Sequence, residues 1–121
     1  MPVPFTVASI RDFYAFEEHV RTCRAHRGLD MVPQWYQVPV FYFSNPAAVI
    51  GDGDPVWAPR GSQELDYELE LAAVVARPAR DLPADDTALE CLAGFTIMND
   101  WSARDLQRVE MAVGLGPSKS K

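Results

Sequence analysis

The sequence has 121 residues, enough for one domain, and its 48% apolar share with six Phe, four Tyr and three Trp argues for a folded chain and against disorder. A formal net charge of -6 disfavours nucleic acid or an anionic membrane as a partner, and it tolerates a bound divalent cation. Two cysteines without CxxC spacing, and no run typical of a secretion signal or membrane span, predict a cytoplasmic protein without a disulfide framework or zinc site.

The N-terminal residues 1–8 are predicted to form a tail, because Pro2 and Pro4 disfavour a helix. Ser9 and Asp12 then have the spacing of a capping box, in which a hydroxyl and an acidic side chain satisfy the first N–H groups of a helix. We therefore expect a helix to begin at Ser9. Its buried stripe would consist of Phe13, Phe16, Val20 and Cys23.

A short strand is predicted at Val40–Phe43, after a loop that lies between two prolines at 33–39. Because successive side chains of a strand point to opposite faces, Tyr42 would lie on the face opposite its two phenylalanine neighbours. The Gly-Asp-Gly-Asp-Pro run at 51–55 is typical of a turn, so the next strand is expected beyond it.

The stretch Leu65–Val75 alternates apolar and acidic residues, which predicts a β-strand with Asp66, Glu68 and Glu70 on one face. Residues two apart on a strand are about 7 Å apart, close enough for two carboxylates to reach one ion. Carboxylate oxygens suit hard cations such as Mg²⁺, Mn²⁺ or Ca²⁺. The alternative is the solvated face of a half-buried strand. From Ala72–Val75 both faces are apolar, so the strand is expected to enter a core there.

A second apolar strand is predicted at Phe95–Asn99, after a short helix that Asp85 or Asp86 would cap. This strand would deliver Asp100 at its end, which is a frequent position of functional groups, although a turn-forming role is the alternative. Carboxylates from the first helix, the acidic strand and this strand end can together form an oxygen-only cage for one ion.

A further capping box at Ser102–Asp105 predicts a brief helix. Arg104 and Gln107 are three residues apart, so they would lie on one side of that helix. Taken alone, Arg104 would be an exposed helix residue paired with an aspartate. The segment Gly114–Lys121 is predicted to be a loop rich in glycine and proline, and it ends in two lysines.

Two segments resemble the signature of the fumarylacetoacetate hydrolase family, namely Asp66–Ala72 and Met98–Gln107. The Asn-Asp-Trp-Ser-Ala-Arg-Asp run in the second segment is long and specific, whereas Glu-x-Glu alone would not be. Ser9–His19 resembles a helix start found in the fumarylacetoacetase-like branch, and Pro39–Tyr42 and Gly116–Lys121 are similar to further pieces of the family. The resemblance covers nearly the whole chain.

The resemblance implies an α+β fold, a mixed β-sandwich roll with flanking helices, in which residues 9–121 would form the N-terminal portion of the catalytic domain. It implies a divalent-metal-dependent hydrolase that cleaves C–C bonds in acylpyruvates and fumarylacetoacetate-type diketo acids. One alternative is a 2-oxo acid decarboxylase or tautomerase with the same metal site. Another is an inactive truncated chain, because family domains continue beyond the residue that matches Lys121.

The same resemblance implies roles for individual residues. The metal ligands, for Mg²⁺ or for Mn²⁺ or Ca²⁺, would be Asp12, Glu68, Glu70 and Asp100. The catalytic residues would be His19 as general base, with Arg104, Gln107 and Lys121 as groups that stabilise developing charge. Tyr14 and Tyr42 would bind substrate. Taken alone, His19 would be a surface helix residue.

The resemblance also implies the partners. The small-molecule partner would be a diketo acid or a 2-oxo acid. Members of the family are commonly dimers, so we expect a homodimer or a complementing second chain. The acidic group that would orient His19 is expected to lie in the part of the family domain beyond this sequence.

Overall fold

The computed structural model describes residues 3–114, 116–117 and 120–121. Its helices are α1 (Glu17–Ala25) and α2 (Arg104–Val113), with the 3-10 helices η1 (Pro33–Tyr36), η2 (Pro46–Ala48) and η3 (Asp86–Cys91). Its strands are β1 (Ile10–Phe13), β2 (Phe41–Ser44), β3 (Leu65–Asp66), β4 (Leu69–Val75), β5 (Leu92–Asn99) and β6 (Ser102–Ala103). The pairs β1–β2, β3–β6 and β4–β5 are antiparallel. The predicted α+β class is confirmed, and none of the described helices is long and apolar enough to cross a membrane.

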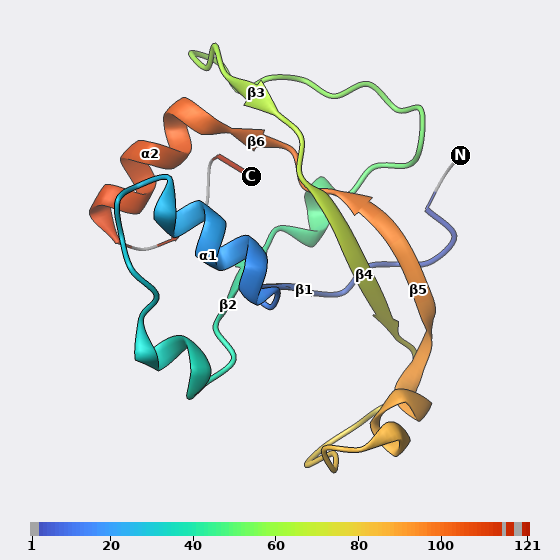
Figure 1. Ribbon diagram of the computed structural model, residues 1–121. Helices are drawn as coiled ribbons and strands as arrows, with labels where there is room; N and C mark the ends of the chain where they lie inside the picture. The colour runs from blue at the N-terminus through green and yellow to red at the C-terminus, as the bar shows by residue number, and fades with distance from the viewer. Residues whose placement is uncertain (1–2, 115, 118–119) are drawn as a thin grey trace.

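The longest pairing joins β4 to β5, which run side by side as a bent ribbon (Figure 1). Its register sets Leu69 opposite Asn99, at the beginning of β4 and the end of β5. The pairing continues one step further, because the N–H of Asp100 donates to the carbonyl of Glu68 at 2.9 Å. This register brings the predicted ligands Glu68 and Asp100 together, although they are far apart in the sequence.

The single strand predicted over Leu65–Val75 is interrupted at Tyr67 and Glu68. β3 pairs with β6 and β4 pairs with β5, so the two halves follow different partners. Side chains satisfy the backbone at the interruption: the N–H of Tyr67 donates to Asp66 Oδ1 at 2.9 Å, and the N–H of Glu68 donates to Asn99 Oδ1 at 3.2 Å. The alternation of the sequence could not reveal this change of partner.

The core expected around Ala72–Val75 is not formed among the described residues. Leu71 is 62% exposed, Val75 is 64% exposed, and Ile97 on the neighbouring strand is 75% exposed. The opposite face of β4, which carries Glu70, is half-buried. The face of the sheet that carries Glu70 is therefore partly covered by the rest of the protein, whereas the apolar face is exposed to solvent.

The helix predicted to begin at Ser9 is wrong, because Ile10–Phe13 forms β1. β1 pairs with β2 in a register that sets Asp12 opposite Tyr42. Helix α1 begins only at Glu17, without a side-chain cap at its N-terminus. Pairing with a strand about 30 residues away outweighs the local capping pattern, as tertiary context commonly does. The strand predicted at Val40–Phe43 is confirmed with a shift of one residue.

The predicted buried stripe is also largely wrong. Val20 is buried, with 1% exposure, but Phe13 and Phe16 are 45% and 66% exposed. Phe13 belongs to β1 and packs against Phe41 of β2, with ring centroids 5.1 Å apart. Its contact is therefore a cross-strand pair and not part of a helix face.

Helix α2 confirms the helix predicted after Ser102, but not its cap. Ser102 lies in β6 and Ala103 is the N-cap residue, which makes no side-chain cap. Asp105 instead accepts hydrogen bonds from Ser62 Oγ at 2.7 Å and from the N–H of Gln63 at 2.8 Å. These contacts attach the first turn of α2 to the segment that leads into β3.

Replacing Asp105 with alanine is expected to lower the free energy of unfolding, because the Ser62 hydroxyl and the N–H groups of Gln63 and Leu106 lose their acceptor. The N–H of Gln63 and the hydroxyl of Ser62 hold the pKa of Asp105 below its usual value. Its stabilising effect is therefore present above the unfolded pKa and is lost as the pH falls through the folded pKa. Urea unfolding at pH 7 and pH 4 measures both effects. The exposed Asp30→Ala is the control, and an equal loss in both variants would contradict this assignment.

Candidate active site

The four predicted metal ligands come from three parts of the fold: Asp12 from β1, Glu68 and Glu70 from just before and within β4, and Asp100 from directly after β5. The hydroxyl of Tyr42 connects two of them, since it lies 2.8 Å from Asp12 Oδ2 and 2.6 Å from Asp100 Oδ2. Burial, and then the hydrogen bonds to these carboxylates, raise the pKa of Tyr42, so the phenol stays protonated. Tyr42 thus joins β2 to the carboxylate cluster.

The pKa values of two of these carboxylates are raised. Burial is the main cause for Asp12, and the neighbouring Asp100 adds to it. Burial also raises the pKa of Glu70, followed by repulsion from Asp12, Glu68 and Asp100. Among the described residues Glu70 has no hydrogen-bond or ion-pair partner. The cluster therefore carries negative charge that its own neighbours do not fully offset.

Lys121 lies in the middle of the cluster, with a side chain that is only 6% exposed. Its Nζ is 3.0 Å from Asp100 Oδ2 and forms an ion pair with Glu68 Oε2. The same ammonium group lies 6.0 Å from the centroid of the Tyr42 ring. The predicted charge-stabilising lysine is thus in contact with two predicted ligands.

Arg104, the first residue of α2, approaches Glu68 from the other side. Its Nη1 forms an ion pair with Glu68 Oε1, and its Nε lies 2.8 Å from Asp66 Oδ2. The Arg104 guanidinium lowers the pKa of Asp66. Nη1 also donates to Gln107 Oε1 at 3.1 Å, which confirms that Arg104 and Gln107 share one side of the helix.

His19 is exposed on α1, and its ring contacts Tyr14 and Cys23 rather than the carboxylates. The Tyr14 ring meets it edge to face, with centroids 5.6 Å apart, and Cys23 Sγ is 3.7 Å from His19 Nε2. No carboxylate of the described residues hydrogen-bonds to the imidazole. Tyr14 contacts His19 and follows Asp12 by two residues, so it connects the imidazole to the segment that carries a predicted ligand. The role of His19 as a base stays a prediction.

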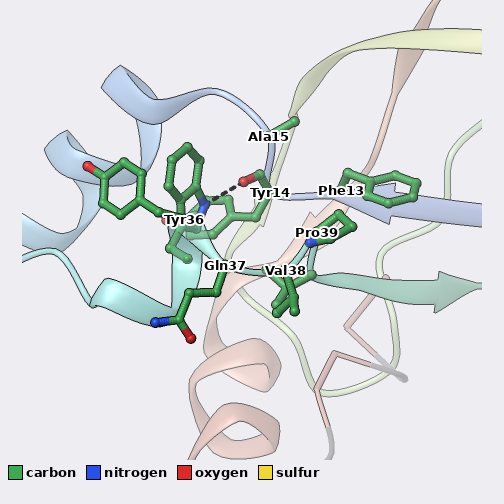
Figure 2. A pocket seen from close by; sticks show the side chains of 9 residues that line it. Phe13, Tyr14, Ala15, Tyr36, Gln37, Val38 and Pro39 are labelled. Atoms are coloured by element: carbon green, nitrogen blue, oxygen red, sulfur yellow. Dashed lines mark hydrogen bonds between the residues drawn. The ribbon is translucent and has the colours of Figure 1, made fainter. Parts of the chain in front are cut away.

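A cavity of about 290 Å³ lies beside Tyr14 (Figure 2). Its lining residues are Phe13, Tyr14, Ala15, Trp35, Tyr36, Gln37, Val38, Pro39 and Val40. Trp35 Nε1 donates to the carbonyl of Tyr14 at 2.8 Å, which fixes the η1 segment against the end of β1. The Tyr36 hydroxyl donates to Glu17 Oε1 at 2.8 Å and holds the same segment to α1. These hydrogen bonds attach η1 to the backbone of Tyr14 on one side and to α1 on the other.

The sequence matches the protein family described as fumarylacetoacetate (FAA) hydrolase C-terminal over residues 8–121. The chain belongs to this family. The fumarylacetoacetases of Oryza sativa subsp. japonica and Arabidopsis thaliana are 38% and 35% identical to it over the whole chain, which covers 32% and 33% of their lengths. A solved structure of an uncharacterized protein from Mycobacterium abscessus has a TM-score of 0.65 and 30% identity, over 97% of this chain and 44% of that one.

The chain thus spans about a third of the length of the curated relatives it matches. The resemblance to the fumarylacetoacetate hydrolase family is confirmed, and with it a relationship to hydrolases at the level of the family.

The donors of this fumarylacetoacetate hydrolase family member fit a hard divalent cation in their chemistry, since all four are carboxylate oxygens and two have raised pKa values. Their arrangement is not that of a finished metal site: no three His, Cys, Asp or Glu side chains of the described residues are placed to hold an ion. The Lys121 ammonium lies between Glu68 and Asp100, where it offsets the charge that a metal ion would otherwise offset.

Sequence reasoning missed Asp66 as part of the site. It shares the guanidinium of Arg104 with Glu68. The signal was present, because the alternation that places Glu68 and Glu70 on one face of a strand places Asp66 there too. It also missed Glu110, whose contacts with Ser120 depend on the path of the chain beyond α2.

Proposed function

We propose that this protein is a divalent-metal-dependent hydrolase of C–C bonds in acylpyruvates and related diketo acids of the fumarylacetoacetate type. The observation that carries the proposal is the contact of Lys121 and Tyr42 with carboxylates from separate strands, at the positions where the family signature predicts ligands. Family membership supports hydrolysis as the reaction class. The family resemblance implies the substrate class, and the donors support it, since two cationic side chains and a hard ion suit an anionic substrate with adjacent carbonyl oxygens.

Asp12, Glu68, Glu70 and Asp100 would hold the ion, which supplies Lewis acidity at a substrate carbonyl when bound. Arg104 and Lys121 would bind the anionic substrate and stabilise negative charge as it develops. The burial of Lys121 supports this role, because a charge acts more strongly where water is excluded. The contact of Arg104 with Gln107 supports a shared substrate-binding side of α2.

His19 would take a proton from the attacking water, which an imidazole can do at neutral pH. Its edge-to-face contact with Tyr14 supports the assignment, because that contact restricts the orientation of the ring. Tyr42, within β2, and Tyr14, directly after β1, would contact the substrate. With an acylpyruvate as substrate, water attack on the acyl carbonyl would break the C–C bond to the methylene carbon, which takes up a proton, and would release a carboxylic acid and pyruvate.

A second candidate function is decarboxylation or tautomerisation of a 2-oxo acid by the same carboxylates and cations. The observation that favours it is the setting of His19, which has no carboxylate hydrogen-bonded to its ring among the described residues. These reactions need no activated water, so they would not require His19 to be oriented as a base.

A product analysis with acetopyruvate and Mg²⁺ or Mn²⁺ tests the proposed function. Hydrolysis consumes one water and yields acetate and pyruvate in equal amounts, which NMR quantifies. Release of CO₂ without acetate would support the decarboxylase, and exchange of the methylene protons without cleavage would support the tautomerase. No conversion with any divalent ion would contradict the proposal.

We further propose that the protein works as a homodimer or with a complementing chain, because the open face of β4–β5 is apolar. Its exposed residues are Leu69, Leu71, Val75, Phe95 and Ile97. Large open apolar faces and unpaired strand edges favour association. Light scattering is expected to give a mass of at least twice 13.5 kDa.

The Ile97→Lys variant tests whether this face is responsible. It is expected to shift the protein towards the monomer, whereas Val109→Lys, at a residue 65% exposed on α2, should not. A wild-type monomer at all concentrations would contradict the association. An effect of equal size in both variants would place the contact elsewhere.

A further inference from the structure

The segment that carries Lys121 is attached to the fold through Ser120, which is buried with 2% exposure. Its hydroxyl donates to Glu110 Oε2 at 2.6 Å, and its N–H reaches the same oxygen at 3.2 Å. Its carbonyl accepts a hydrogen bond from the N–H of Ala103 at 2.8 Å. Ser120 is therefore held by α2 through Glu110 and by β6 through Ala103.

We propose that Glu110 is a positioning residue, which acts through Ser120 to set the Lys121 ammonium between Glu68 and Asp100. The peptide bond joins Ser120 to Lys121, so fixing the backbone of one fixes where the side chain of the other begins. From this buried backbone position the Lys121 side chain extends to the cluster, where its Nζ lies 3.0 Å from Asp100 Oδ2. The catalytic role of Lys121 rests on the proposed function. The positioning of Lys121 by Glu110 and Ser120 rests only on the contacts described above.

The chemistry of a carboxylate suits this task. One ionised oxygen can accept both donors of Ser120, and hydrogen bonds to a charged acceptor are shorter and stronger than neutral ones. Removing the acceptor would leave a hydroxyl and an N–H unsatisfied in a buried place, which is costly. The segment is then expected to detach rather than stay in place with its donors unpaired.

The arrangement also couples the two cationic groups of the site. Arg104 begins α2, and Glu110 lies further along the same helix. The helix therefore holds one cation directly and the other through Ser120, on two sides of Glu68. A displacement of α2 would move both charges relative to the carboxylates, so substrate binding and charge stabilisation would change together.

Zero-length cross-linking of the full chain with a water-soluble carbodiimide tests the inference, because it joins an amine to a carboxylate only when the two are in contact. In the wild type, peptide mapping by mass spectrometry is expected to find Lys121 linked to Asp100 or Glu68. Glu110→Ala is expected to lower the yield of this link by about tenfold, since it removes charge-assisted hydrogen bonds from a buried group. Glu110→Gln keeps an oxygen acceptor and is expected to restore most of the yield.

Glu64→Gln is the matched control, because Glu64 pairs with Arg108 of the same helix and does not contact Ser120. It is expected to keep the wild-type yield. Ser120→Ala removes only the hydroxyl, so it tests the same contact if Glu110→Ala does not fold, and it too should lower the yield. Wild-type yield in the folded Glu110→Ala or Ser120→Ala protein would overturn the inference. An equal loss in Glu64→Gln would overturn it as well. Product analysis with acetopyruvate is separate, so failure of the proposed function would leave this result unchanged.

Discussion

Replacing His19 with alanine is expected to lower acylpyruvate turnover by about 10²–10⁴-fold, because it removes the imidazole proposed to take a proton from water. The affinity for the metal ion should change by no more than about twofold, since the ring does not contact the carboxylates that would hold it. Initial rates over a range of substrate concentrations separate kcat from KM. The loss is expected in kcat, which is the signature of a group that acts in the chemical step.

His26→Ala is the matched control, because His26 is the other histidine of the chain and follows α1 as its C-cap residue. It is expected to keep wild-type turnover. Unchanged turnover in His19→Ala would move the base elsewhere and would favour the decarboxylase or tautomerase. A rise in KM with unchanged kcat would instead make His19 a substrate-binding residue.

Features of the site that depend on local periodicity could be predicted from the sequence. A spacing of three placed Arg104 and Gln107 on one side of α2, where they are hydrogen-bonded. Alternation placed Glu70 on the half-buried face of β4, although Glu68 lies just before that strand. The position of Asp100 at the end of β5 follows from a short apolar run that stops there. These patterns involve neighbours along the chain, so no knowledge of distant contacts was needed.

Features that depend on distant pairing could not be predicted in this way. The Ser9–Asp12 pattern is a helix start on local grounds, but pairing with β2 makes a strand of it. The formation of a strand instead of a helix matters for the site, because the strand register sets Asp12 opposite Tyr42. A helix would not place these two residues together. In a helix, Asp12 and His19 would share a face, whereas here His19 belongs to a separate element.

The apolar face of β4 shows a third limit. The sequence correctly indicates that Ala72–Val75 is apolar on both faces, and such a strand needs cover from two sides. Among the described residues that cover is missing for Leu71 and Val75. Periodicity says that a face requires a partner, but it does not say which segment supplies it.

Glu70→Ala is expected to weaken the binding of Mg²⁺ or Mn²⁺ by about 100-fold or more. Removing a metal ligand lowers the affinity more than removing a group that only hydrogen-bonds to a ligand. Glu70 is the carboxylate of the cluster with the clearest need for a cation. Among the described residues it has no hydrogen-bond or ion-pair partner, and burial and its acidic neighbours raise its pKa. Isothermal titration calorimetry on metal-free protein measures the affinity.

The pH dependence of this binding follows from the direction of the pKa shifts. Metal ligands must be deprotonated, and the pKa values of Asp12 and Glu70 lie above their ordinary 3.8 and 4.5. Affinity is therefore expected to rise as the pH increases through these raised values. In the metal-free protein the folded state holds these protons more tightly than the unfolded state does. Its stability is thus favoured below the ordinary pKa values and decreases as the pH rises through the folded ones.

Glu70→Gln separates the charge of this residue from its shape. Without metal at pH 7 it is expected to unfold at the same temperature as the wild type or a higher one, because it removes repulsion from Glu68 and Asp100. With Mg²⁺ the order should reverse, since the wild type gains stability from binding and the variant gains little. Glu90→Ala, in η3 and away from the cluster, should follow the wild type in both conditions. Equal metal affinity in the wild type and Glu70→Ala would remove Glu70 from the ligand set, and a metal-free Glu70→Gln protein much less stable than the wild type would show that its carboxylate has a partner in the folded chain.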